Sequence, residues 1–243
     1  MPKFLSYDIE IYNDLPEGSH ILDGIVPSIA ATCTSKEDLR YWFNTPYMTP
    51  ETAKELVLFM TDKMSEGIIP FTWNGLAFDF PLLAQHSGLI KECAELALNG
   101  VDGMFIIVAN KGYFLGLDTA LKGAGLETKT HEVKLNSGMA FSEMSGKEAP
   151  RLWRDGEYDA VKTYLAGDVF RPLELISAIE RNHGIRWTSK AGNVMFQTTP
   201  LTPVKDLFKL PIPDTHWMTD PKPRSEFVKW IPQEILNKYN INP

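Results

Sequence analysis

Two carboxylates stand in the middle of an apolar run near the start of the chain. The segment Lys3–Ile11, KFLSYDIEI, has the composition of a buried β-strand and carries Asp8 and Glu10 two residues apart. Residues two apart on a strand share a face, so both carboxylates point the same way. Like charges in an apolar setting are costly unless a cation neutralises them. Oxygen ligands of this kind suit Mg²⁺ or Mn²⁺, although D-x-E alone is a weak signal and fits a strand end emerging into solvent better.

The rest of the chain suggests alternating strands and helices. After this first strand, further strands are predicted over 25–33, 39–44 and 68–73. Thr49 is a candidate N-cap with Pro50 at the first helical position, and a second clear amphipathic helix begins at Tyr158. Short helical pieces are expected between 79 and 158. The order predicts an α/β fold in three layers, with a mixed, mainly five-stranded sheet flanked by helices.

Composition limits the classes of protein to which the chain can belong. It has 243 residues, two separate cysteines and no long apolar run, so disulfide scaffolds and membrane spans are not expected. We expect a cytoplasmic protein without membrane contact and without a leader peptide. Prolines accumulate and periodicity fades past about residue 185. We therefore predict a domain over 1–184 and a Pro-rich, basic C-terminal extension over 185–243 that packs on it.

The net charge of −7 argues against non-specific binding of nucleic acid, because phosphate affinity comes largely from Lys and Arg. The charge is uneven, however, and basic residues outnumber acidic ones from Arg181 onward. Within this part, Arg186, Trp187 and Lys190 combine cations with a stackable aromatic ring. They are candidate nucleic-acid contacts, with a surface pair as the equally good alternative.

A second group of candidate residues lies in the segment WNGLAFDFP at 73–81. Here the fourth strand ends, Gly75 permits a tight turn, and Asp79 opens a helix with Pro81 just inside it. Asp79 is placed at the carboxyl edge of the sheet, where the active sites of α/β proteins form. The alternative is that Asp79 is only an N-cap, with Asn74 as a turn residue and Phe78 as a hydrophobic staple.

A third group lies on the late helix. Tyr164 and Asp168 are four residues apart, so they share a helix face beside apolar positions that indicate burial. The alternative is an exposed tyrosine and aspartate on the outer face. Pro172 removes the hydrogen bond that would reach the carbonyl of Asp168, so a kink or restart of the helix is expected there.

Taken together, the three groups resemble the DEDD superfamily of exonucleases on the ribonuclease H-like fold. The similarity covers 4–181 and is greatest to the tyrosine branch, which includes the proofreading domains of family B DNA polymerases. The histidine branch would have His where Thr163 stands. The residues that match the family pattern are Asp8, Glu10, Asn74, Phe78, Asp79, Tyr164 and Asp168.

The resemblance implies a 3′–5′ exonuclease that uses two divalent cations, Mg²⁺ or Mn²⁺. Asp8 would bridge both ions, Glu10 and Asp168 would hold one, and Asp79 would hold the other. Tyr164 would orient the attacking water, since a free phenol titrates too high to be the base.

Under the same resemblance, Asn74 and Phe78 would line the pocket of the terminal nucleotide. The partner would be single-stranded nucleic acid with a free 3′ end, DNA favoured over RNA. Two alternatives stay open, namely an inactive nucleic-acid-binding module and a phosphodiesterase of small nucleotides.

Overall fold

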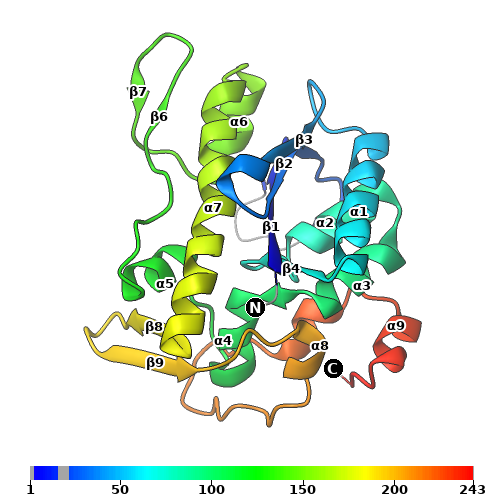
Figure 1. Ribbon diagram of the computed structural model, residues 1–243, viewed down its shortest axis with the longest axis vertical. Helices are drawn as coiled ribbons and strands as arrows, with labels where there is room; N and C mark the ends of the chain where they lie inside the picture. Colours follow the sequence, from blue (N-terminus) through cyan, green and yellow to red (C-terminus); the bar gives the residue numbers. More distant parts are fainter. Residues whose placement is uncertain (1–2, 16–21, 243) are drawn as a thin grey trace.

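The computed structural model describes residues 3–15 and 22–242, and a five-stranded mixed sheet forms its centre (Figure 1). The strand order is β3-β2-β1-β4-β5. β1 is antiparallel to β2 and parallel to β4, so the strand with the two carboxylates is the central one. The strands are β1 (Lys3–Ile11), β2 (Pro27–Cys33), β3 (Arg40–Phe43), β4 (Ile68–Thr72) and β5 (Val101–Asp102). This α/β arrangement confirms the predicted fold class and is consistent with the ribonuclease H-like fold.

Helices cover both faces of the sheet. α7 (Tyr158–Asn182) and α6 (Ala149–Arg154) pack on one face, and the opposite face is covered by α1 (Pro50–Ser65), α2 (Asp79–Ser87) and α3 (Ile90–Asn99). None of the helices in the described ranges is both long enough and apolar enough to cross a membrane. The sheet is therefore buried on two sides, as a three-layer fold requires.

The alternation along β1 divides its side chains between the two layers. Leu5, Tyr7, Ile9 and Ile11 are buried in the hydrophobic cluster on the side of α1, α2 and α3. Each fully buried apolar side chain of this kind contributes about 1.5–3 kcal/mol to folding. The polar residues between them face α7, so packing on one side of the strand fixes the carboxylates on the other.

Two local predictions have clear outcomes. Thr49 is the N-cap of α1, and its hydroxyl accepts the backbone N–H of Thr52 at 3.3 Å, with Pro50 at the start of the helix as predicted. α7 is a single helix of 25 residues with Pro172 inside it, so the prediction of a restart is wrong. Pro172 is buried, as are Val169 and Leu175 near it, and this burial stabilises the helix despite the missing hydrogen bond.

The stretch between α3 and α7 is less helical than the sequence suggests. A small hairpin of β6 (Val133–Lys134) and β7 (Ala140–Phe141) follows α4 (Gly103–Lys111) and α5 (Leu117–Gly123). Elsewhere, between β2 and β3, a short 3₁₀ helix spans Lys36–Asp38. The hairpin strands have two residues each, too short for an alternating pattern to be detected.

The C-terminal extension contains regular structure and shares the core of the rest of the chain. Its elements are β8 (Gly184–Thr188), β9 (Val194–Thr198), α8 (Val204–Leu207), a 3₁₀ helix (Arg224–Val228) and α9 (Gln233–Lys238). Buried Val204, Phe227 and Leu236 belong to the same hydrophobic cluster as β1. β8 lies so close to α5 that a Cβ on Gly123 would be 1.8 Å from the carbonyl oxygen of Arg186. The boundary at 184 and 185 stays a prediction.

A core substitution tests whether the extension is an integral part of the fold. The Phe227 ring is 3% exposed and its centroid lies 5.1 Å from that of Phe105. Phe227→Ala should lower the free energy of unfolding by about 3–5 kcal/mol, because it leaves a cavity in the shared core. Urea denaturation measures this loss. Ile212→Ala, at an 86% exposed position of the same extension, is the control and should change little. If both variants lost the same small amount of unfolding free energy, the extension would be only loosely attached to the rest of the fold.

Candidate active site

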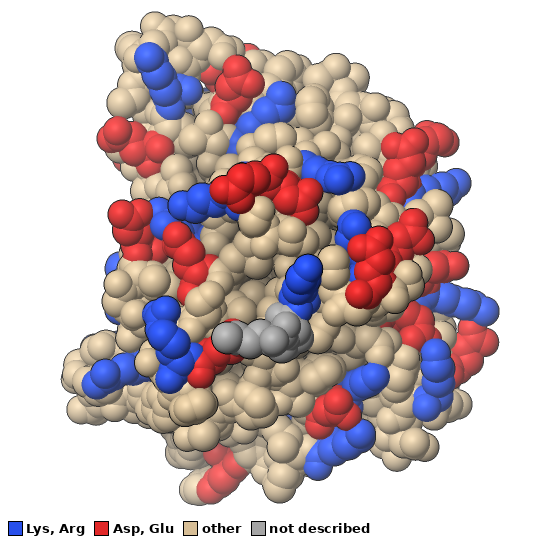
Figure 2. Space-filling view, in the orientation of Figure 1, with Lys and Arg blue, Asp and Glu red and all other residues tan. Residues whose placement is uncertain are grey.

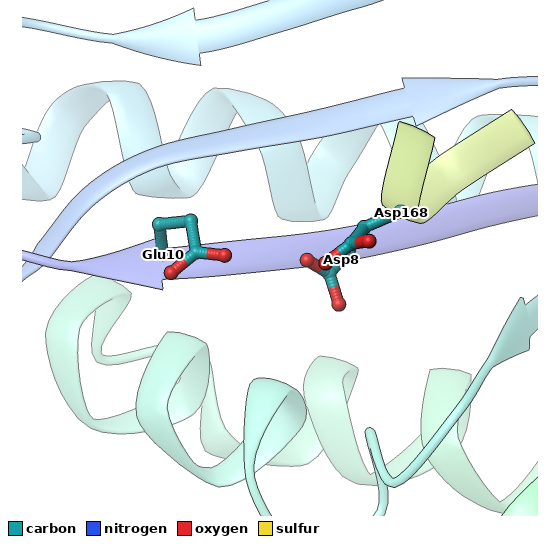
Figure 3. A group of neighbouring side chains, drawn as sticks. All are labelled: Asp8, Glu10 and Asp168. Atoms are coloured by element: carbon teal, nitrogen blue, oxygen red, sulfur yellow. The ribbon is translucent and has the colours of Figure 1, made fainter. Parts of the chain in front are cut away.

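Three carboxylates meet between the central strand and α7. Asp8 and Glu10 of β1 and Asp168 of α7 each bring an oxygen into a group whose members lie within 4.8 Å of one another (Figure 3). Glu10 and Asp168 are buried, and Asp8 is partly exposed. Oδ1 of Asp168 is buried, and no hydrogen-bond partner for it stands among residues 3–15 and 22–242. An unsatisfied buried oxygen beside two further carboxylates fits a hard divalent cation, so this donor set could hold Mg²⁺ or Mn²⁺.

The fourth predicted carboxylate lies in the same cleft but outside this group. Asp79 is the first residue of α2, and Phe78 takes the N-cap position. The carboxylate of Asp79 is buried, and its Oδ1 accepts the backbone N–H of Ile9 at 3.1 Å. The alternative in which Asp79 is merely the N-cap therefore does not describe this structure. Its bond to β1 falls between the two carboxylates of that strand.

A cleft of about 910 Å³ surrounds these side chains. It lies along β1, the turn after β4, and α7, at the size expected for a small-molecule site. Trp73 and the exposed Lys147 also line it. The cleft brings together all the residues that the family resemblance singled out, namely Asp8, Glu10, Asn74, Phe78, Asp79, Tyr164 and Asp168.

Lys129 is a site residue that the sequence does not reveal. Its Nζ lies 2.6 Å from Oδ2 of Asp168 and donates a hydrogen bond to the Tyr164 hydroxyl at 3.0 Å. Lys129 stands in the irregular segment between α5 and β6, where no periodicity assigns it to a face. The only available signal is physical, because an acidic cluster requires a cation from somewhere in the chain.

The electrostatics of the cleft follow from burial. Burial raises the pKa of Asp8, Glu10 and Asp168, and the neighbouring carboxylates raise the pKa of Asp8 and Glu10 further. Lys129 acts in the opposite direction on all three. The cluster therefore favours either protons or bound cations over free negative charge.

Tyr164 is placed to donate a hydrogen bond. It is 2% exposed, and burial, followed by the charges of Glu10 and Asp168, raises the pKa of its phenol. The phenol thus stays protonated. Because Lys129 donates to the phenolic oxygen, the phenol proton is the group that Tyr164 can donate, and a hydrogen bond from Tyr164 lowers the pKa of Asp168. This geometry suits the orientation of a water molecule and not its deprotonation.

The predicted contacts in the C-terminal extension lie elsewhere. Arg186 and Lys190 are exposed on the β8–β9 hairpin and do not line the cleft. Trp187 is 3% exposed and packs against Tyr113, so the prediction that its ring stacks on a base needs correction. On β8 alternate side chains face opposite sides, which turns Trp187 inward where Arg186 points outward.

Comparison with known proteins shows a similarity of structure. The chain resembles part of the family B DNA polymerase from the hyperthermophilic archaeon Pyrobaculum calidifontis, with a TM-score of 0.51 and 19% sequence identity. The match covers 73% of this chain and 24% of that polymerase, so the chain spans about a quarter of its length. No protein-family model and no curated protein sequence matches the chain. At this identity the similarity establishes the fold alone.

The pKa of Asp79 predicts how stability depends on pH. Burial, followed by the nearby charge of Asp102, raises that pKa from 3.8 to about 7. The folded state thus holds a proton that the unfolded chain releases, and stability is lost as pH rises through this interval. The melting temperature of the metal-free protein should fall between about pH 4 and about pH 7. Mn²⁺ should raise the melting temperature most at the higher pH, because cations bind ionised carboxylates.

Thermal melts in chelator and in Mn²⁺ measure this effect. Asp79→Asn should make the metal-free fall smaller, leaving the part due to the raised pKa of Asp8 and Glu10. A profile that is flat in the wild-type protein would contradict the assigned electrostatics of the cleft.

The ion pair between Lys129 and Asp168 gives a second measurable consequence. Lys129→Met should destabilise the metal-free protein by about 3 kcal/mol, the low end for breaking a buried pair, because protonation of Asp168 limits the cost. Saturating Mn²⁺ should reduce this loss, since a bound cation replaces the lysine charge. Thermal melts with and without Mn²⁺ test it, with exposed Lys122→Met of α5 as the control. If Lys129→Met lost the same stability with and without Mn²⁺, the lysine charge and the bound cation would not act on the same carboxylate.

Proposed function

We propose that this chain is a metal-dependent 3′–5′ exonuclease that hydrolyses terminal phosphodiester bonds of single-stranded nucleic acid, DNA in preference to RNA. The observation that carries the proposal is the group of Asp8, Glu10 and Asp168, with its unpaired buried oxygen, inside a cleft. Support comes from the similarity of the fold to part of a family B DNA polymerase. The sequence resemblance points to the exonuclease domain of such polymerases.

The carboxylates would hold two divalent cations. Asp8, Glu10 and Asp168 are the ligands proposed for one, and Asp79 together with Asp8 for the other. When bound, such ions make water a nucleophile near neutral pH and offset the charge that develops on the leaving oxygen. The side chains are held before binding, because β1 is the central strand of the sheet and Asp79 is tied to its backbone.

Tyr164 and Lys129 would act on the reacting groups from the α7 side. The protonated phenol of Tyr164, held by Lys129, would donate its hydrogen bond to the attacking water once a cation occupies Asp168. Lys129 is 27% exposed and lines the cleft, so its charge can also stabilise a phosphate oxygen there. The two groups share a hydrogen bond, which fixes the position of each.

The opposite wall would receive the terminal nucleotide. Asn74 and Phe78 line the cleft next to Asp79, where an amide can contact a base edge or sugar and a ring can stack on a base. Unpaired bases stack in this way more readily than bases of a duplex, which favours single-stranded substrate.

Lysines of the cleft would supply local phosphate contacts. Acidic and basic side chains are intermingled over the described residues of the face in Figure 2, so that face carries no large basic patch. Lys129 and Lys147 line the cleft and would contact the phosphates there. Arg186 and Lys190 stay proposals as outer contacts for longer strands.

A cleavage assay tests the proposal directly. Linear single-stranded DNA and RNA of about twenty nucleotides, longer than one binding site, are labelled at the 5′ end and incubated with Mg²⁺ or with chelator. We expect stepwise shortening from the 3′ end only with Mg²⁺, and none with Asp8→Ala. Tyr164→Phe should lose about 10- to 10³-fold in rate, because it deletes one positioned hydroxyl and keeps the ring.

Three results would contradict the proposal in different ways. Cleavage of circular strands at the linear rate would indicate an endonuclease. Cleavage of dinucleotides alone would indicate a small-nucleotide phosphodiesterase. Binding without any cleavage would indicate an inactive nucleic-acid-binding module. Circular dichroism should show that Asp8→Ala is folded, since losing one charge relieves repulsion in the metal-free cluster.

A further inference from the structure

The turn between β4 and α2 contains a residue in the left-handed region of backbone space. Asn74 has a positive φ of 79°, a conformation that asparagine adopts more readily than other residues except glycine. Gly75 is also constrained, because a Cβ there would lie 2.5 Å from the side chain of Thr72. This turn, 74–78, presents Asn74 and Phe78 to the cleft, so contacts that hold its backbone also set the orientation of these two side chains.

One source of stabilisation is the buried carboxylate of Asp102. This residue ends β5 and is 2% exposed. Its Oδ1 accepts the backbone N–H groups of Asn74 at 3.1 Å and Phe105 at 2.9 Å, and its Oδ2 accepts that of Leu76 at 2.9 Å. The bond to Phe105 caps α4, for which one oxygen suffices. The other two bonds reach across to the turn, and such charge-assisted bonds are strong ones.

A second source comes from the C-terminal extension. The indole Nε1 of Trp230 donates to the carbonyl oxygen of Leu76 at 2.9 Å. Both backbone polar groups of Leu76 are thus bound by side chains from distant parts of the chain, one by Asp102 and one by Trp230. The Leu76 side chain is itself 1% exposed, so core packing and two backbone hydrogen bonds together hold this residue in place.

We infer that Asp102 and Trp230 are positioning residues for the terminal-nucleotide pocket, acting through the backbone of the turn 74–78. The inference rests on the proposed function, since it assigns a role within the same site. Neither side chain lines the cleft, so neither would touch the substrate. Their effect is to keep Asn74 and Phe78 in the orientation that a bound nucleotide requires, which lowers the ordering cost of binding.

Substitutions of Asp102 separate positioning from helix capping. Asp102→Ser retains an N-cap for α4 but is too short to bond the turn. Asp102→Asn keeps one acceptor and presents an N–H group to the N–H of Leu76. Both variants should raise KM for a short single strand about tenfold, the effect of losing one strong hydrogen bond, while kcat changes less than KM. Trp230→Phe keeps an aromatic ring and removes the bond to the Leu76 carbonyl, so it should raise KM in the same direction.

A matched control removes a cap elsewhere. Thr49→Ala deletes the N-cap of α1, far along the chain from the turn, and should lower the melting temperature without changing KM. If Asp102 and Trp230 act through one turn, the double variant should raise KM by less than the product of the single effects. Independent multiplication of the two effects would overturn the shared role, and an unchanged KM in both Asp102 variants would overturn the inference.

Two further measurements distinguish failure of this inference from failure of the proposed function. Binding of a phosphorothioate tetranucleotide, which resists cleavage, should weaken in the Asp102 variants as KM rises. Mn²⁺ binding, followed by electron paramagnetic resonance, should be retained at the triad of Asp8, Glu10 and Asp168, which is untouched, while loss of the Asp102 charge should lower the pKa of Asp79 and not weaken Mn²⁺ binding. A wild-type protein that neither binds the oligonucleotide nor cuts any strand would refute the function. Normal wild-type activity with unaffected Asp102 variants would refute only the positioning role.

Discussion

The concentration of negative charge beside the central strand is the constraint on which the rest of the site depends. Asp8, Glu10 and Asp168 approach within 4.8 Å in a largely buried setting, where ionised carboxylates repel and are poorly solvated. The apolar face of β1, packed on α1, α2 and α3, provides the free energy that holds them there. Without that packing the strand would relax and the carboxylates would separate.

The chain supplies only part of the compensating charge. Lys129 bonds one oxygen of Asp168 and leaves the other oxygen without a partner. One lysine opposite three carboxylates, with Asp79 in the same cleft, leaves an excess of negative charge that protons or divalent cations must neutralise. The same imbalance that destabilises the metal-free protein thus provides affinity for a cation, and stability and function are linked through one set of residues.

Local patterns predicted much of this architecture. Alternation placed Asp8 and Glu10 on one face of a buried strand, and the Thr49-Pro50 pair placed the start of α1. The spacing of Tyr164 and Asp168 put both on one face of α7. These predictions are correct because each depends on a single element, where the periods of strand and helix are fixed.

Contacts between distant segments could not be predicted in the same way. Lys129 and Asp102 reach their partners from irregular or very short elements, so no period marks the direction of their side chains. Trp187 is a different case. Its inward direction follows from the alternation of β8, but that strand is short and stands among prolines, and its cation-rich surroundings suggested exposure instead.

The contact of Trp230 with the turn changes how the C-terminal extension should be understood. If the extension were only an outer nucleic-acid contact, its removal would weaken binding of long strands and spare short ones. Trp230 instead bonds Leu76, and Phe227 packs in the shared core. Deleting the extension would disturb the pocket and the fold together, so its effect on substrate length would have no single cause. Exposed Arg186 and Lys190, which do not line the cleft, can instead be changed to isolate an electrostatic contribution, and a lower salt dependence of binding would be its sign.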